Sequence, residues 1–281
     1  MEQIGRHFDV TGSLREVIHH FYCIRTPSDF QKISQHLSPN LEMMIAFNFG
    51  EPVRLPFGSD PLGDMQIDKV AVLGPLRKLL NYEIPADTDL IIAVFNLDGF
   101  YRLFQLPMDD LGTDKIIDPD KLLNITGFSD LWEMLKNLSS LSDRIELLKE
   151  YALAFIAEPE QATIPLVNGI SYFHNPVTQP VKAIAADSEL SERTIQMRFK
   201  KYVGYSPKEL LRFLRFKQVI ASIQEQEKKE VDWYSLVEKF GYHDQSHLIK
   251  DFNHYLGTTP QKFVKQILGE EFCVTKYDLK D

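Results

Sequence analysis

Two stretches of this 281-residue chain repeat one pattern, and that repeat constrains the fold more than any other feature. "FKKYVGYSPKELLR" (199–212) and "FNHYLGTTPQKFVK" (252–265) align at an offset of 53 residues. The matching pairs are Phe199 with Phe252, Tyr202 with Tyr255, Gly204 with Gly257, Ser206 with Thr259, and Pro207 with Pro260. A repeat in register over these positions indicates two copies of one structural unit.

The shared positions describe a helix, its end, and the start of the next helix. Phe and Tyr three residues apart mark a buried helix face. Glycine ends the helix in a left-handed conformation, and Ser or Thr followed by Pro begins the next one. A shorter helix is expected before each copy, at 178–187 and at 232–240. Two helices joined by a short turn form a helix-turn-helix, so the chain is predicted to contain two.

The helix patterns separate a buried face from an exposed one. The predicted core of the two units consists of Ala185, Ile195, Phe199, Gly204, Pro207, Gly241, Leu248, Phe252, Gly257 and Pro260. Candidate DNA-binding residues are Arg193, Thr194, Gln196, Lys200, Gln245, Ser246, His247 and Lys250. Arg and Gln near a helix N-terminus reach base edges in the major groove, and Lys contacts phosphates. His247 either packs within its unit or faces DNA.

A long helix is expected between the copies, within "SPKELLRFLRFKQVIASIQEQ" (206–226). Its length of roughly 25–30 Å would place the second helices of the two units, near 192–203 and 244–256, in successive major grooves, about 34 Å apart.

The region 163–268 resembles the DNA-binding domain of AraC/XylS-type transcription regulators. "SERTIQMRFKKYVGYSP" is similar to the first recognition helix of that family, and "GYHDQSHLIKDFNHYLGTTP" to the second. The resemblance implies a bacterial, cytoplasmic regulator, such as an activator, that binds double-stranded DNA at an operator or promoter. It also implies a homodimer, a small-molecule effector and contact with RNA polymerase, and it implies no cofactor.

The chain departs from the family pattern at three positions. Glu189 replaces a glycine in the first turn. Met197 replaces an arginine of the first recognition helix, with Arg198 next to it on the flank. His243 is expected at the N-cap of the second recognition helix, where a better capping residue is usual.

The stretch "HDQSH" (243–247) raises a competing interpretation, because two histidines four residues apart are typical of zinc hydrolases. His243 is expected at or before the helix start and His247 beside the core residue Leu248, so the pair does not share one open helix face. The upstream copy contains no histidine. We therefore predict no metal site here.

The first half of the chain has a different pattern. Short apolar runs at 41–50, 69–74, 89–99 and 100–107 predict strands separated by turns, with acidic turns at 59–64 and 109–114. Residues 130–158 follow a helical period and predict one or two amphipathic helices, with Ser142 as an N-cap. The fold class is α+β: a mainly β sensor-like domain (1–158), of which a cupin-like barrel is one form, an all-α domain (159–268), and a fraying tail (269–281).

Two features of the first half bear on an effector. Phe47, Phe49, Phe95, Phe100, Tyr101 and Phe104 either line an apolar pocket or, as we favour for each one, belong to the core. Arg102 binds an anionic effector or pairs with a neighbouring acid; the sequence leaves both open. By analogy alone, the helices at 130–157 form a dimer interface.

Charge and cysteine content narrow the function classes. Residues 1–170 carry a net charge of −11 and residues 182–217 a net charge of +5, so an anionic partner is expected to bind the C-terminal half. No apolar run is long enough to span a membrane, and the start lacks the pattern of a signal peptide. The rival hypothesis is an N-terminal enzyme domain anchored to DNA, for which Cys23 would need a strongly lowered pKa.

Overall fold

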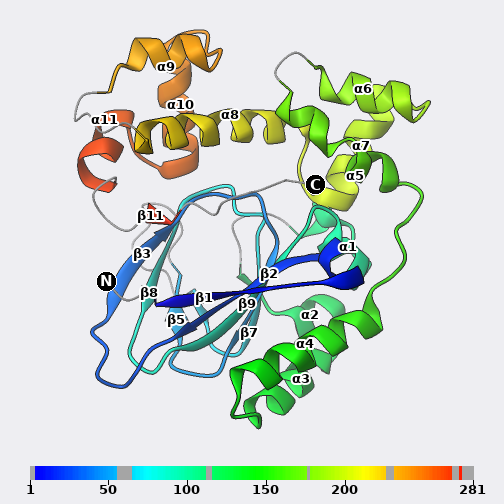
Figure 1. Ribbon diagram of the computed structural model, residues 1–281, viewed down its shortest axis with the longest axis vertical. Helices are drawn as coiled ribbons and strands as arrows, with labels where there is room; N and C mark the ends of the chain where they lie inside the picture. The colour runs from blue at the N-terminus through cyan, green and yellow to red at the C-terminus, as the bar shows by residue number, and fades with distance from the viewer. Residues whose placement is uncertain are drawn as a thin grey trace.

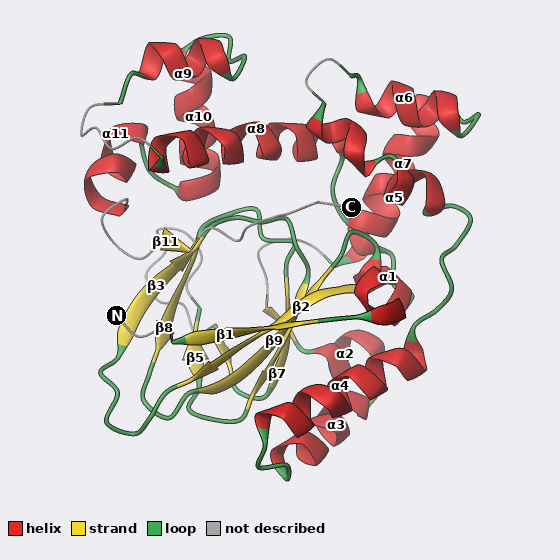
Figure 2. Ribbon diagram, viewed as in Figure 1, coloured by secondary structure: helices red, strands yellow, loops and turns green. Residues whose placement is uncertain are grey.

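The computed structural model describes residues 4–55, 65–111, 116–175, 178–225, 231–267 and 272–273. The N-terminal half is rich in β-strands, and the chain from Ile164 to Ile267 is helical (Figures 1 and 2). The long helix α8 (Pro207–Gln224) runs past the β-rich part, with other helices at both of its ends (Figure 1). The protein therefore has the predicted α+β fold, with a β-rich domain followed by an all-α region.

Two sheets form the β-rich domain. The six-stranded sheet has the order β1-β2-β9-β4-β7-β10, and the five-stranded sheet has the order β11-β3-β8-β5-β6. The strands are β1 (Gly5–Asp9), β2 (Ile18–Arg25), β3 (Ile33–Leu37), β4 (Met44–Asn48), β5 (Val53–Arg54), β6 (Gln66–Ile67), β7 (Val70–Leu73), β8 (Leu80–Ile84), β9 (Asp89–Phe95), β10 (Ile116–Ile117) and β11 (Phe272–Cys273). Neighbouring strands are antiparallel, except that β11 is parallel to β3.

The six-stranded sheet is covered on both faces. Met44 and Ala46 of β4 pack between the sheets with Val53, Leu80 and Ile84. Ile45 and Phe47, which point the other way along the same strand, join a second core beneath the helices. This double burial explains the continuous apolar runs that predicted β4, β7 and β9 at 41–50, 69–74 and 89–99.

The expected strand at 100–107 is wrong, because residues Gly99–Phe104 form helix α1. Phe100 and Phe104 stack one helical turn apart, with ring centroids separated by 4.2 Å, and Phe95 meets Phe100 edge-on. A short apolar run fits a strand and a buried helix equally well, so packing against the sheet decided between them.

Further helices cover the same side of the domain. They are the 3₁₀ helices η1 (Gly12–Glu16) and η2 (Met108–Asp110), and the α-helices α2 (Pro119–Leu123), α3 (Gly127–Lys136) and α4 (Leu141–Phe155). The helical pattern at 130–158 thus corresponds to two helices. The N-cap of α4 is Ser140 and not the predicted Ser142, since the Ser140 hydroxyl accepts the N–H of Asp143.

The all-α region contains α5 (Ile164–Asn168), the 3₁₀ helix η3 (Ile170–His174), α6 (Pro180–Asp187), α7 (Glu192–Val203), α8, α9 (Trp233–Lys239), α10 (Gln245–Leu256), α11 (Pro260–Lys262) and the π-helix η4 (Phe263–Ile267). One hydrophobic core extends from the β-rich domain into this region, with Leu41, Leu79 and Met108 on one side and Tyr205 and Phe213 on the other.

Three expectations fall wholly or partly outside the described residues. These are the acidic turn at 59–64, the second half (112–114) of the turn at 109–114, and the fraying tail at 269–281, of which only 272–273 are described, as β11. Among the described helices, none is both long and apolar enough to cross a membrane.

Candidate nucleic-acid interface

The first helix-turn-helix consists of α6 and α7. Ser191 caps α7, with its hydroxyl accepting the N–H of Thr194 at 3.1 Å. Gly204 ends α7 at φ 89°, and its N–H donates to the carbonyl oxygens of Phe199 and Lys200. Ile195 and Phe199 are completely buried, and Ala185 packs with them. These buried side chains fix which face of α7 is exposed.

The second unit consists of α9 and α10 and repeats this construction. Leu248 and Phe252 are buried, and Gly257 ends α10 at φ 65°. The predicted capping role of His243 is wrong: Asp244 is the N-cap, and its carboxylate accepts the N–H of His247 at 2.8 Å. A carboxylate at a helix N-terminus satisfies a free N–H group and complements the helix dipole, which a histidine does poorly.

Both recognition helices present polar side chains to solvent. On α7, the exposed side chains include Arg193, Gln196, Met197 and Lys200, while Thr194 is half-buried. On α10, they include Ser246, Ile249, Lys250 and Asn253, while Gln245 and His247 are half-buried. Five of the eight candidate DNA-binding residues are thus exposed, and the other three are half-buried.

Arg198 does not share that exposed face. The side chain is half-buried, and Nη1 donates to the carbonyl oxygen of Ala162 at 3.3 Å. Its neighbour Met197 is 62% exposed. The polar contact that the family pattern expects at Met197 is therefore not replaced from the adjacent position in this conformation.

Sequence reasoning missed the most buried charge of the second unit. Asp251 is completely buried on α10, and it accepts hydrogen bonds from Nε of Arg212 at 2.7 Å and from the Tyr242 hydroxyl at 2.9 Å. Nη2 of Arg215 lies 4.0 Å away. The available signal was an acid on the inward stripe of α10 combined with two arginines three residues apart on α8. Burial and the nearby carboxylate raise the pKa of Tyr242, so its hydroxyl remains a donor.

The histidines of "HDQSH" are separated in the structure. The His243 side chain is 90% exposed, and its Nδ1 lies 3.3 Å from Oδ2 of Asp244. His247 packs edge-on against Tyr242, with ring centroids 5.3 Å apart. No group of three or more His, Cys, Asp or Glu residues in the described part of the chain is arranged to hold a metal ion.

Helix α8 separates the two units, which lie at its opposite ends (Figure 1). It contains 18 residues and begins with a capping box formed by Ser206 and Glu209. At about 1.5 Å per residue, its length is roughly 27 Å, within the range predicted from the sequence. Phe216 of α8 packs against Phe252 and Tyr255 of the second unit, with ring centroids 5.1 Å and 4.7 Å away.

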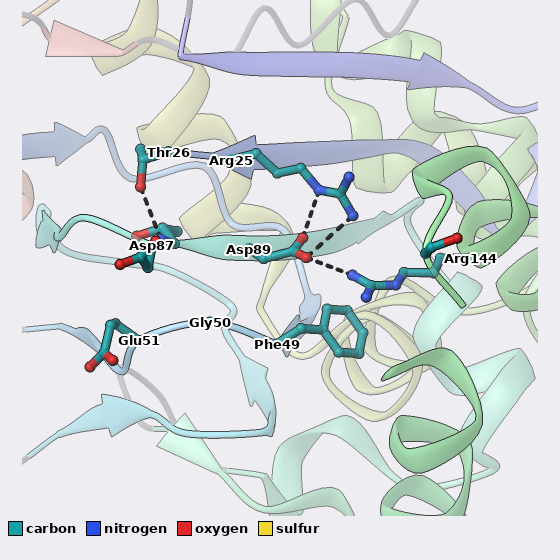
Figure 3. Close-up of a pocket in the computed structure, with 10 residues that line it drawn as sticks. Arg25, Thr26, Phe49, Gly50, Glu51, Asp87, Asp89 and Arg144 are labelled. Atoms are coloured by element: carbon teal, nitrogen blue, oxygen red, sulfur yellow. Dashed lines mark hydrogen bonds and ion pairs between the residues drawn. The ribbon is translucent and has the colours of Figure 1, made fainter. Parts of the chain in front are cut away.

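The β-rich domain contains an open cavity of about 570 Å³, lined by Arg25, Thr26, Phe49, Gly50, Glu51, Asp87, Thr88, Asp89, Ser139 and Arg144. The guanidinium groups of Arg25 and Arg144 both point toward Asp89 (Figure 3), at 2.9 Å and 2.7 Å. Arg144 also donates to the carbonyl oxygens of Leu135 and Leu138, and it lies over the ring of Phe49. The cavity is thus lined both by the β-strands and their loops and by the hairpin of α3 and α4.

The other candidate effector residues have structural roles. Phe47, Phe95, Phe100 and Tyr101 are buried in the core, with Phe104 packed against it, whereas Phe49 both packs against the core and lines the cavity. Arg102 is buried, and it donates to Glu16 and to the carbonyl oxygen of Ala157, both at 3.0 Å. Of the two alternatives for Arg102, the structure supports pairing with an acid.

Cys23 is buried on β2, and burial raises the pKa of its thiol to about 12. A nucleophilic cysteine needs the opposite shift, because the thiolate is the reactive form. The rival hypothesis of a cysteine-based enzyme domain is therefore not favoured.

Two families match the chain in separate regions. Residues 184–266 match a family described as a helix-turn-helix domain, and residues 7–118 match a domain of unknown function, DUF6597. No curated protein sequence matches.

Several solved structures match most of the chain at low identity and low TM-score. ToxT from Vibrio cholerae has 11% identity over 94% of this chain and 98% of its own, with a TM-score of 0.38. Another ToxT structure, bound to (E)-4-(8-methylnaphthalen-1-yl)but-3-enoic acid, has 12% identity over 87% and 97%, with a TM-score of 0.37. The AraC-like transcriptional activator CuxR has 14% identity over 77% and 86%, with a TM-score of 0.30. At these TM-scores the likeness carries no argument.

The helix-turn-helix match agrees with the duplicated and capped units seen in the structure. Residues 184–266 are therefore identified as a helix-turn-helix domain.

Proposed function

We propose that the protein regulates transcription by placing α7 and α10 in two successive major grooves of an operator or promoter. The observation that carries this proposal is the duplication itself. Each unit has a buried core face, a capped recognition helix and an exposed polar face. The two units lie at opposite ends of α8, which is roughly 27 Å long, whereas successive major grooves lie about 34 Å apart.

Individual residues take different roles in this proposal. Arg193, Gln196, Gln245 and Ser246 contact base edges, since they lie within the first two turns of their helices. Lys200 and Lys250 contact phosphates from the exposed faces. Thr194 and His247 are half-buried and contribute at the edge of each interface.

Selection from random double-stranded oligonucleotides with the full-length chain tests the proposal. We expect enrichment of two half-sites and a steep loss of affinity with salt. Arg193→Ala should weaken binding by about 1–3 kcal/mol and relax specificity in one half-site. Lys250→Ala should weaken binding uniformly and reduce the salt slope by about 1. Lys121→Ala is the matched control, because this lysine is exposed in the β-rich domain. Absence of any enriched sequence would contradict the proposal.

We further propose that a small molecule controls the protein through the β-rich domain, with a domain boundary near residue 158. The candidate site is the cavity at Arg25 and Arg144 (Figure 3). Its three acids, Glu51, Asp87 and Asp89, outnumber the two arginines, so a cationic or zwitterionic ligand matches its charge. Small molecules can be screened by thermal shift with the wild-type chain and with the Glu51→Gln variant. A ligand that stabilises both proteins equally binds elsewhere.

The α3–α4 hairpin is the candidate dimer surface, since Met134, Leu153 and Phe155 are each at least half exposed. Exposed apolar side chains grouped on one hairpin are typical of an interaction surface. Sedimentation of the wild-type chain and of Phe155→Asp tests it, with a dimer expected only for the wild type. Contact with RNA polymerase stays a prediction from the family resemblance.

A further inference from the structure

Residues 74–80, which are the connection between β7 and β8 and the first residue of β8, lie against the all-α region. Its conformation is fixed within the β-rich domain, because the carbonyl oxygen of Leu76 accepts the N–H groups of Asn40 and Leu41 at 3.2 Å and 3.1 Å. The Leu76 side chain is completely buried between the sheets. The 74–80 segment is therefore a rigid part of the β-rich domain.

Arg77 of this segment contacts the first helix-turn-helix. Its Nη2 donates to the carbonyl oxygen of Gly204 at 2.8 Å, and its Nε donates to Oε1 of Glu209 at 3.1 Å. Gly204 is the C-cap of α7, and Glu209 belongs to the capping box of α8. The Arg77 side chain is only 15% exposed. The guanidinium group thus spans the joint between the first recognition helix and α8.

Leu79, two residues later, contacts the second helix-turn-helix. Its N–H donates to the carbonyl oxygen of Tyr255, in the last turn of α10, at 2.7 Å, and its side chain is buried. In the register of the repeat, Tyr255 corresponds to Tyr202 and Gly257 to Gly204. The segment therefore contacts the C-terminal ends of both recognition helices at nearly equivalent positions.

These contacts form a second connection between the two units. The units lie at opposite ends of α8 (Figure 1), and α8 is their covalent connection. Long helices bend gently, so α8 by itself leaves the angle between the units adjustable. A bridge parallel to α8 removes that freedom. Adding one base pair between half-sites moves a groove by about 3.4 Å and one tenth of a helical turn, so small changes of this angle alter which spacing fits.

We propose that Arg77 is a positioning residue for DNA recognition, and that the 74–80 segment fixes the relative orientation of α7 and α10. The segment thereby determines which half-site spacing the protein accepts. The predicted effect of the segment on half-site spacing rests on the proposed groove binding. The predicted effect on the orientation of α7 and α10 does not.

The first unit has an additional contact with the β-rich side, and the experiment has to allow for it. The Tyr202 hydroxyl donates to Oε2 of Glu160 at 2.8 Å, and the Tyr101 hydroxyl donates to the same carboxylate. Loss of Arg77 alone therefore loosens the first unit only partly. Insertion of two glycines after Lys78 separates the two anchor points instead, while leaving Arg77 and Leu79 in the chain.

The test is a distance measurement between spin labels in the full-length chain. Ala186→Cys and Glu238→Cys place labels on exposed positions of α6 and α9, in a background with Cys23→Ser and Cys273→Ser. We expect one narrow distance distribution for the parent, a broader one for Arg77→Ala, and the broadest for the Gly-Gly insertion. The distance distribution of Arg77→Lys should be narrower than that of Arg77→Ala. The same insertion after Ser28, in an exposed loop, is the control.

Binding to selected DNA sites supplies the second measurement. One base pair inserted between half-sites should cost the wild type at least tenfold in affinity and the Gly-Gly insertion variant less than threefold. Thermal unfolding establishes which variants are folded. Equal widths of the distance distributions for all folded variants would overturn the inference. If the distributions broaden but no variant binds DNA, the orientation effect stands and the proposed groove binding fails.

Discussion

At the scale of single residues, one buried carboxylate organises the second helix-turn-helix. Asp251 is completely buried and bonds to Arg212 and Tyr242, so α8, α10 and the preceding turn meet at one charge. In the register of the repeat, its counterpart in the first unit is Arg198, which bonds to Ala162 instead. The two units thus share their apolar core and differ in their buried polar contacts.

Removing that carboxylate is predicted to destabilise the protein strongly. Asp251→Ala leaves the guanidinium of Arg212 and the Tyr242 hydroxyl without this acceptor, which costs about 3–5 kcal/mol. Asp251→Asn retains an acceptor oxygen and should cost less. Urea unfolding measures both, and Asp29→Ala, in an exposed loop, is the control. A loss below about 1 kcal/mol for the alanine variant would contradict the role assigned to Asp251.

At the scale of elements, the turns of the two units differ in backbone strain. Glu189, between α6 and α7, has φ 54°, a left-handed conformation that favours glycine. In the second unit the turn contains Gly241, at φ 65°. The absence of the usual glycine at 189, noted in the sequence, therefore places a side chain in a strained backbone conformation.

Glu189→Gly is predicted to stabilise the protein by about 0.5–1 kcal/mol. Relief of a left-handed conformation gains about 1–2 kcal/mol, and the added freedom of the unfolded chain offsets part of it. Glu192→Gly, in the first turn of α7, should instead destabilise by up to about 1 kcal/mol. Thermal unfolding of both variants distinguishes the two backbone environments, and a destabilised Glu189→Gly variant would show that strain is not the dominant effect.

At the scale of the whole molecule, a buried acid lies where the β-rich domain meets α8. Glu42 accepts a hydrogen bond from Nδ2 of Asn40 at 2.6 Å, and it interacts electrostatically with Lys217 of α8. Burial raises the pKa of the Glu42 carboxyl from 4.5 to about 8, with Lys217 acting in the opposite direction. Stability therefore depends on pH through a group at the contact between the two parts of the chain.

The sign of that dependence follows from the raised pKa. Between pH 4.5 and about 8 the folded state retains a proton that the unfolded state has released, so the free energy of unfolding falls as pH rises. Glu42→Gln removes this contribution. We expect equal stability of variant and wild type near pH 4.5, and a variant more stable by about 2–4 kcal/mol near pH 8. Urea unfolding at both pH values measures the difference, and a constant difference would exclude Glu42 as its source.

The duplicated units could be predicted from the amino-acid sequence, because glycine, proline and capping residues act locally and recur at a fixed offset. Strands β4, β7 and β9 could be predicted for a related reason, since strands buried on both faces are continuously apolar. The exposed positions of Arg193, Lys200 and Lys250 follow from the fixed period of a helix.

The remaining features depend on contacts that form only in the folded chain. Helix α1 and the cap at Asp244 depended on which neighbours the backbone met, and two-residue strands such as β5 and β6 lack a distinctive pattern of their own. Asp251, Glu42 and Arg77 each interact with a charged residue of another element, respectively Arg212, Lys217 and Glu209, that lies at least 39 residues away along the chain. Contacts between distant segments have no local periodicity, so folding alone brought Arg77 and Leu79 to the ends of both recognition helices.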